Sequence, residues 1–206
     1  HDRAEMQAFV PSEAQVFLEI GCGGRGFAKL LNETIDLKEY WAVEPVTGVT
    51  SLEDIPNSKL LNLPVEEAWA QLPDAYFDCV IMNDVLEHLE NTESSLAQVR
   101  KKLRDGGCLI ASIPNVRYIE NLRELLIGKD WRYREEGILD KTHLRFFTQK
   151  SIERTLTSAG FQIEKSYGIN PNSHWKYVWL NRLLFNAIHD TLYLQFGICA
   201  RIQGQG

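Results

Sequence analysis

Short apolar runs alternate with segments of helical spacing along this chain. Consecutive apolar residues predict buried strands, and apolar residues three and four positions apart predict helices. The predicted strands are 16–20, 40–43, 59–61, 77–82, 108–113, 161–166 and 192–202. The predicted helices are 26–32, 65–71, 94–103, 148–159 and 174–189. Strands that alternate with helices in this way indicate a doubly wound α/β fold with a mainly parallel sheet.

Residues 116–147 interrupt this alternation with aromatic and charged side chains, among them Trp131, Tyr133 and Phe146. An irregular insert directly after a central strand predicts a helical or loop lid over the sheet edge. The sequence shows no internal repeat, low-complexity tract or linker. We therefore expect a single domain over residues 1–206, with the lid inside it.

Composition narrows the class of protein. Apolar residues make up 44% of the 206 residues and charged residues 24%, which is ordinary for a globular protein. The net charge of −6 gives no support for nucleic acid as a partner. No window predicts a membrane span, and no secretory leader is apparent. The four cysteines form no CxxC pair, and three lie in strand-like runs, so we expect reduced thiols and a cytoplasmic location.

The most informative motif follows the first predicted strand. Gly21, Gly23 and Gly26 form a GxGxxG pattern between a buried strand and a helix. Glycines there permit positive φ and let a ligand approach the backbone, and the helix start offers free N–H donors. The pattern alone fits any nucleotide cofactor, including NAD.

Two carboxylates sharpen this prediction. Glu19 lies two residues before Gly21, where a cationic ligand group could use its charge. Glu44 ends the second predicted strand, where an acid can accept hydrogen bonds from both ribose hydroxyls of a nucleotide. Acids at strand ends are also commonly only solvated, so their joint occurrence carries the prediction.

With these motifs in place, the sequence resembles the class I S-adenosylmethionine-dependent methyltransferases over about residues 3–202. The resemblance rests on Glu19 to Gly23, on Val43 to Pro45, on the segment 77–89, and on Leu103 to Gly107 followed by a strand. It implies a Rossmann-like sheet of seven strands with the last strand antiparallel. It also implies S-adenosyl-L-methionine as cofactor.

The resemblance implies a set of residues that contact the cofactor. They are Glu19, Gly21, Cys22, Gly23, Glu44, Val65, Asn83 and Asp84. One position departs from the family: Pro64 stands where an acid often meets the adenine amino group. Adenine recognition is then expected from the Val65 backbone or from Glu66.

A narrower resemblance covers residues 112–118 and 137–148. These segments are similar to a bacterial branch of the family whose members often accompany polysaccharide biosynthesis at the cell surface. The resemblance implies O-methylation of a sugar hydroxyl, on a small or glycan-linked acceptor, with N-methylation left open. Two rival readings are a nicotinamide-dependent oxidoreductase and a non-catalytic cofactor-binding scaffold.

Transfer of a methyl group to a neutral hydroxyl requires removal of a proton, for which a general base contributes about 10²–10⁴-fold. His88 and His143 are the candidate catalytic bases, because both lie in segments expected at the carboxyl edge of the sheet. The alternative for both is a structural role, as a helix cap or in packing near the cofactor.

A metal ion is the alternative to a free base. If a helix begins at Asp84, then Asp84, Glu87 and His88 share one face, and His143 could join them. Similar clusters hold a divalent metal in the ubiquinone-pathway and small-RNA O-methyltransferases. Asp84 is one carbon shorter than the acid found there, so we expect no metal. In that case Glu87 is expected to pair with an arginine such as Arg117 or Arg145.

Two further segments have more than one reading. The insert carries Arg117, Arg123, Arg132, Arg134, Lys141 and Arg145 among acids, which fits a solvated lid face or a phosphate site on the acceptor. Apolar residues between 175 and 188 form a broad stripe. This stripe predicts core packing or a homodimer contact, with an interfacial membrane role as the alternative.

Overall fold

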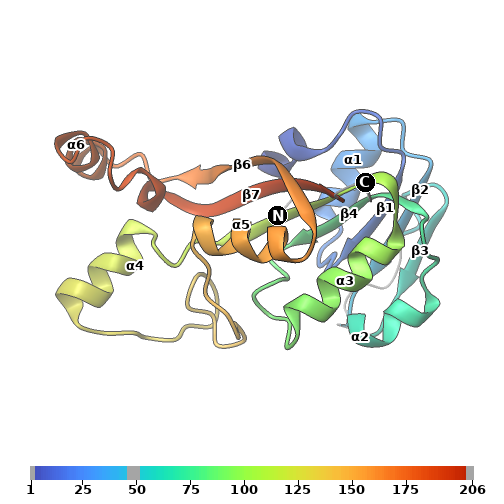
Figure 1. Ribbon diagram of the computed structural model, residues 1–206, viewed down its shortest axis with the longest axis horizontal. Coiled ribbons are helices and arrows are strands. Elements are labelled where there is room, and N and C mark those ends of the chain that lie inside the picture. Colours follow the sequence, from blue (N-terminus) through green and yellow to red (C-terminus); the bar gives the residue numbers. More distant parts are fainter. Residues whose placement is uncertain (1–2, 46–51, 203–206) are drawn as a thin grey trace.

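The fold is an α/β sheet covered by helices on both faces (Figure 1). The computed structural model describes residues 3–45 and 52–202. The strands are β1 (Val16–Ile20), β2 (Glu39–Val43), β3 (Ser58–Leu61), β4 (Phe77–Asn83), β5 (Leu103–Pro114), β6 (Phe161–Pro171) and β7 (Tyr193–Ile202). Within this part of the chain they form one seven-stranded sheet in the order β3-β2-β1-β4-β5-β7-β6.

Strand directions confirm the predicted topology. The pairs β1–β2, β1–β4, β2–β3 and β4–β5 are parallel. The final strand β7 inserts between β5 and β6 and runs antiparallel to both. The chain order reverses beside β1, which places the ends of β1 and β4 at the switch point where doubly wound folds bind ligands.

The helices divide between the two faces. They are α1 (Gly26–Thr34), α2 (Val65–Ala68), α3 (Thr92–Lys102), α4 (Ile119–Arg123), α5 (Gln149–Ser158) and α6 (Trp175–Leu183). A core that contains Leu18 lies beneath α2, α3 and α5, whereas Phe17 points into a second core with α1 and the 3-10 helix η1 (Ala4–Phe9). Successive side chains of one strand thus point alternately into the two cores, as expected for a sheet covered on both faces. None of the described helices is both long and apolar enough to cross a membrane.

Local signals explain where several helices begin and end. The Asn91 side chain accepts the Ser94 amide at the start of α3. Thr148 and Ser151 form a capping box at the start of α5. Gly160, with φ of +82°, ends the turn after α5, where a left-handed residue is favourable only for glycine.

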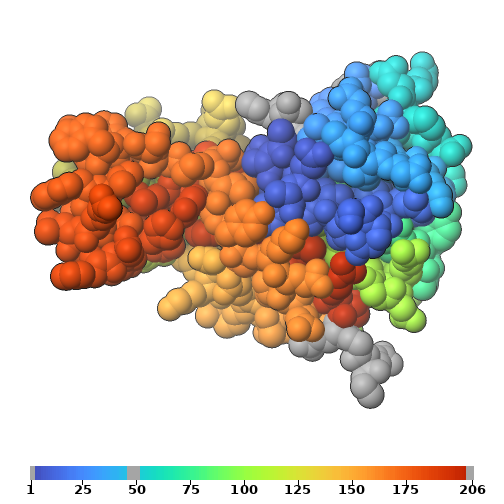
Figure 2. Space-filling view, turned by 90° about the horizontal axis from the view of Figure 1, so that it is seen from above, coloured from blue at the N-terminus to red at the C-terminus, as the bar shows by residue number. Residues whose placement is uncertain are grey.

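The predictions were wrong at the C-terminal side. The predicted helix 174–189 stops at Leu183, because Phe185 and Asn186 adopt positive φ and break the helical path. A 3-10 helix, His189–Leu192, follows it. Strand β6 continues to Pro171, five residues beyond its predicted end, and pairs along its length with β7. Figure 1 shows β6 and β7 carrying α6 to the far left end of the molecule, and in Figure 2 this end is formed by the orange to red part of the chain.

The insert after β5 is anchored at both its ends. The Asn115 amide donates to the Leu194 carbonyl at 2.9 Å, and the Val116 amide donates to the Phe147 carbonyl at 2.9 Å. Between these anchors the chain forms α4, a π-helical turn (Glu124–Gly128) and an irregular stretch up to α5. The predicted lid region is therefore a loop with one short helix, held against β7.

Packing between η1 and β7 gives a direct stability test. A Cβ atom at Gly197 would lie 2.3 Å from Cζ of the fully buried Phe9. Overpacking of this kind costs about 1–3 kcal/mol, so Gly197→Ala should lower the free energy of unfolding by that amount in urea titrations. In Phe9→Leu the ring is gone, and Gly197→Ala should then cost less than it does alone. Equal costs in both backgrounds would contradict the contact.

Candidate active site

Strand register brings the predicted ligand-binding residues to one edge of the sheet. Ile20 lies opposite Val43 on β2, and Glu19 lies opposite Ile81 on β4. Gly21 and Glu44, which follow β1 and β2, and Asn83, the last residue of β4, therefore lie side by side at the carboxyl edge. The structure brings together the three loops in which most of the predicted cofactor contacts lie.

The glycine loop packs closely against Val85 at Gly21 and is open at Gly23 and Gly24. Gly21 has φ of +73°, and a Cβ there would lie 2.7 Å from Cγ2 of Val85. Gly23 has φ of +48°, and its amide donates to Oε2 of Glu44 at 2.9 Å. Among the described residues, no heavy atom outside the chain neighbours lies within 4 Å of a Cβ built at Gly23 or Gly24. A ligand can therefore approach the backbone there.

Glu19 is a buried acid whose charge is not balanced by a close cation. Only 3% of it is exposed, and its carboxylate accepts a hydrogen bond from the Tyr40 hydroxyl. Burial, with the negative Glu44 nearby, raises the pKa of Glu19 to about 7, against the opposing effects of Tyr40 and Arg3. A cationic ligand beside this carboxyl would favour its ionised form.

Asn83, the last residue of β4, and Asp84, the next residue, differ in their contacts. The buried Asn83 side chain has no hydrogen-bond partner among the described residues for either its oxygen or its nitrogen. Asp84, with φ of +53°, forms an ion pair with Arg3 and accepts hydrogen bonds from Ser112 at 2.9 Å and Gln195 at 2.7 Å. Asn83 is thus available to a ligand, whereas Asp84 is fully engaged by the protein.

Cys22 and Val65 are also buried near this edge. Burial, with the charges of Glu19 and Glu44, raises the pKa of Cys22 to about 12, so it stays a neutral thiol. Val65 begins α2 directly after Pro64, in a position to offer backbone rather than charge. All four cysteines are free and buried, as expected for the three in strands.

A second group of side chains joins the turn after β4 to the insert. The Leu144 and Arg145 amides both donate to the Glu87 carbonyl, at 2.8 and 3.2 Å. These bonds bring His88 and His143 together, with ring centroids 4.6 Å apart. Both predicted catalytic histidines therefore belong to one cluster with Glu87.

Hydrogen bonds define which histidine nitrogens are free. Nδ1 of His143 lies 2.9 Å from the Ile138 carbonyl, which only accepts, so this Nδ1 carries the proton. Nδ1 of His88 lies 3.0 Å from the Thr142 hydroxyl and 3.3 Å from the Thr142 carbonyl. Because the Thr142 hydroxyl donates its proton to Asp140, Nδ1 of His88 is the donor here too, and Nε2 of each ring is left as an acceptor. Burial, followed by the neighbouring His143, lowers the pKa of His88, which keeps this ring neutral at pH 7.

Glu87 lies in this cluster without a hydrogen-bond partner. It is 1% exposed, neither carboxyl oxygen has a partner, and Oε1 lies 3.9 Å from Nε2 of His143. Burial and the negative Asp84 raise the pKa of Glu87 well above its ordinary value. A cation in the cluster would stabilise the ionised form of Glu87.

The structure differs from two sequence interpretations of this region. The helix considered for residues 84–88 is a turn, and Asp84 points to Arg3 and Gln195 instead of joining the cluster. Glu87 does not pair with Arg117 or Arg145. Arg117 bonds Asp190 at 2.5 Å, and Arg145 donates to the Leu89 carbonyl. Sequence reasoning also missed Arg3, Gln195 and Tyr40, because no local motif marks a partner that lies far away in the chain.

A cavity of about 960 Å³ opens in front of the histidines. Carboxylates dominate its polar wall, which includes Glu5, Asp84, Glu87, Glu135, Glu136 and Asp140. Its two cationic residues are engaged by acids, since Arg3 pairs with Asp84 and Arg134 with Glu124. The wall therefore favours a neutral or cationic molecule over a phosphate group.

Comparison with known proteins agrees with the geometry. A family model described as a methyltransferase domain matches residues 3–166. A protein of Mycolicibacterium smegmatis named as a probable S-adenosylmethionine-dependent methyltransferase is 28% identical over 158 residues, covering 74% of this chain and 54% of that protein. The chain spans about half the length of the curated relatives it matches.

Solved structures share the fold. A SAM-dependent methyltransferase from Archaeoglobus fulgidus aligns with a TM-score of 0.68 at 18% identity, covering 96% of this chain and 91% of that one. A Burkholderia thailandensis 1,6-didemethyltoxoflavin-N1-methyltransferase, solved with S-adenosylhomocysteine, aligns with a TM-score of 0.60 at 19% identity, covering 98% of this chain and 77% of that one.

The fold and the glycine loop define a Rossmann-like nucleotide-binding domain of the methyltransferase type. The chain belongs to the methyltransferase domain family and has the class I fold found in S-adenosylmethionine-dependent methyltransferases. This membership displaces the oxidoreductase reading of the glycine pattern.

The raised pKa of Glu19 predicts a pH-dependent affinity. A neutral Glu19 cannot balance a sulfonium or ammonium charge, and the bound cation lowers its pKa, so binding should release a proton. Affinity for S-adenosylmethionine should therefore rise from about pH 6 to about pH 8 and level off once Glu19 is ionised. Calorimetry in buffers of different ionisation enthalpy measures both effects. Glu19→Gln should abolish the proton release and the pH dependence of affinity that are due to this residue. An unchanged pH profile in that variant would contradict the role of Glu19.

Proposed function

We propose that this protein transfers the methyl group of S-adenosylmethionine to a hydroxyl oxygen of a sugar or glycan-linked acceptor. The observation that carries the proposal is the cavity of about 960 Å³ that joins the two histidines to a wall of carboxylates. Carboxylates accept hydrogen bonds from several hydroxyl groups at once, which suits a polyol. The same wall disfavours a phosphate group close to the histidines.

In this proposal the cofactor lies over the open glycine loop. Glu44 accepts hydrogen bonds from the ribose hydroxyls, and the unpartnered Asn83 amide bonds the cofactor. Glu19 provides negative charge behind the loop for the cationic methionine part. Cys22 lines the loop, and the Val65 backbone meets adenine in place of the missing acid. Asp84 contributes indirectly, by holding Arg3 and Gln195 at the edge.

His88 is the proposed general base. Its pKa is lowered, its Nε2 is free, and it is less buried than His143. As the acceptor oxygen forms its bond to the methyl carbon, the carbon–sulfur bond breaks and its electron pair stays on sulfur. The hydroxyl proton moves to Nε2 of His88. Positioning supplies the rest of the rate, because the sulfonium is already a good leaving group.

The same cluster also fits a divalent metal. Glu87, His88 and His143 each offer a ligand atom, and these atoms lie within 4.8 Å of one another. The unpartnered Glu87 oxygens suit a cation, and both Nδ1–H groups are already oriented by carbonyls, as in many metal sites. A bound ion would acidify the acceptor hydroxyl. We favour the metal-free base, because Asp84 is committed to Arg3 and leaves only three protein ligands.

The base assignment predicts the behaviour of His88 variants. With a panel of free sugars and glycosides as acceptors, formation of S-adenosylhomocysteine should fall about 10²–10⁴-fold in His88→Gln. Cofactor affinity should be unchanged, because His88 lies on the acceptor side. The wild-type rate should decrease as the pH falls below the pKa of His88. In His88→Gln this decrease at low pH should be absent from the pH–rate profile.

Three outcomes test the assignment. Full activity in His88→Gln would contradict a base at this position. Loss of turnover on exhaustive chelation, reversed by Mn²⁺, would show that the cluster works through a metal. Cofactor binding without turnover on any acceptor would favour the scaffold reading.

A further inference from the structure

Helix α6 presents its apolar face to solvent. Trp175, Val178, Trp179 and Leu183 are 69%, 41%, 61% and 58% exposed, and their spacing places them on one face of the helix. The one buried residue of α6 is the polar Asn181. The stripe is therefore not part of the core, which excludes the first of the expected roles and leaves a dimer contact or an interfacial role.

More exposed apolar residues lie beside this helix. Phe185, just after α6, is 95% exposed, and Leu126 and Ile127 of the π-helical turn are 71% and 76% exposed. In Figure 1, α6 and α4, which precedes the π-helical turn, lie at the same end of the molecule. We call residues 125–127 and 175–185 the apolar tip. Exposed apolar side chains that gather at one end of a molecule mark an interaction surface.

The charge around α6 indicates what covers the apolar tip. Residues 173–189 contain Lys176 and Arg182 and no acid, although the whole chain has a net charge of −6. Arg182 falls within the exposed face, and Nζ of Lys176 lies 5.9 Å from the Trp175 ring centre. Exposed tryptophan, leucine and phenylalanine with flanking lysine and arginine are characteristic of helices that lie in an anionic membrane interface.

A second copy of the chain fits this surface less well. A two-fold dimer through α6 would bring Lys176 and Arg182 of one copy towards the same residues of the other. The segment 173–189 offers no acid to balance them. Anionic lipid headgroups supply the missing negative charge and the acyl region receives the tryptophans.

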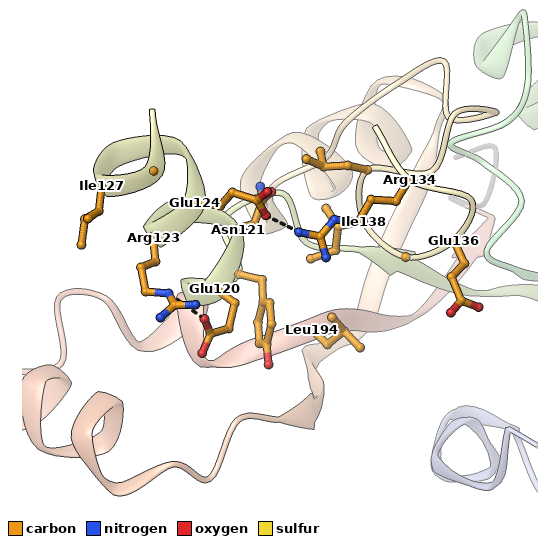
Figure 3. Close-up of a pocket in the computed structure, with 13 residues that line it drawn as sticks. Glu120, Asn121, Arg123, Glu124, Ile127, Arg134, Glu136, Ile138 and Leu194 are labelled. Atoms are coloured by element: carbon orange, nitrogen blue, oxygen red, sulfur yellow. Dashed lines mark hydrogen bonds and ion pairs between the residues drawn. The ribbon is translucent and has the colours of Figure 1, made fainter. Parts of the chain in front are cut away.

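The apolar tip also adjoins the acceptor side of the molecule. Ile127 lines a cavity of about 700 Å³ between α4, the insert and β7 (Figure 3). Gly137, Ile138 and Leu194 line both this cavity and the acceptor cavity in front of the histidines. We propose that the apolar tip docks this methyltransferase on an anionic lipid surface, with the acceptor cavity close to that surface. The docking itself does not depend on the identity of the acceptor.

Vesicle co-sedimentation tests this directly. The wild-type protein should bind vesicles of phosphatidylcholine with phosphatidylglycerol, and bind pure phosphatidylcholine more weakly. The double variant Trp175→Ala/Trp179→Ala should lose at least tenfold in affinity. The double variant Lys176→Gln/Arg182→Gln should lose about fivefold in vesicle affinity for each charge removed, and only on the anionic vesicles. Tyr76→Ala, which removes an exposed aromatic ring just before β4, is the control and should bind like the wild type.

Circular dichroism and affinity for S-adenosylhomocysteine should be unchanged in these variants, since every altered side chain is exposed. Failure of the wild type to bind either vesicle would overturn the proposal. So would tryptophan variants that bind as well as the wild type. A concentration-dependent dimer in sedimentation velocity that disappears in Trp175→Ala/Trp179→Ala would assign the surface to a second copy instead. None of these outcomes bears on whether the methyl acceptor is a sugar.

Discussion

The close contact between Gly21 and Val85 sets the arrangement of the site. A Cβ at position 21 would lie 2.7 Å from Cγ2 of Val85, so the glycine loop and the turn after β4 can meet only where the first has no side chain. This contact holds the loop that approaches the cofactor against the turn that carries Glu87 and His88. It therefore determines the spacing between the two halves of the active site.

Around that contact the protein keeps several polar groups in an unfavourable state. Glu19 is buried with its pKa raised to about 7, and the Asn83 amide and both Glu87 oxygens lack partners. Buried polar atoms without partners cost about 1–3 kcal/mol each, so the folded chain maintains them against its own stability. Their position at the carboxyl edge of the sheet matches a ligand that supplies the missing charge and hydrogen bonds.

Structural features that depend on a short local stretch of sequence could be predicted, and features that depend on contacts between residues far apart in the chain could not. The glycine loop, Glu44 at the end of β2 and the order of strands follow local patterns, and the structure agrees with them. Arg3 and Gln195 reach Asp84 across 81 and 111 residues, which no spacing rule reveals. The apolar periodicity of α6 was visible, but periodicity alone does not tell which face meets the core. The positive φ of Phe185 and Asn186, which ends that helix region, was equally hidden.

The most direct test of the account is a calorimetric titration of S-adenosylhomocysteine and of NAD into the purified protein. We expect S-adenosylhomocysteine to bind and NAD to give no binding heat. Glu44→Ala should lower the affinity for S-adenosylhomocysteine about ten- to a hundredfold, because it removes hydrogen bonds to a charged group. The control Glu33→Ala, at an exposed position on α1, should leave the affinity unchanged. Binding of NAD alone, or an unchanged affinity in Glu44→Ala, would contradict the account of this edge as the cofactor site.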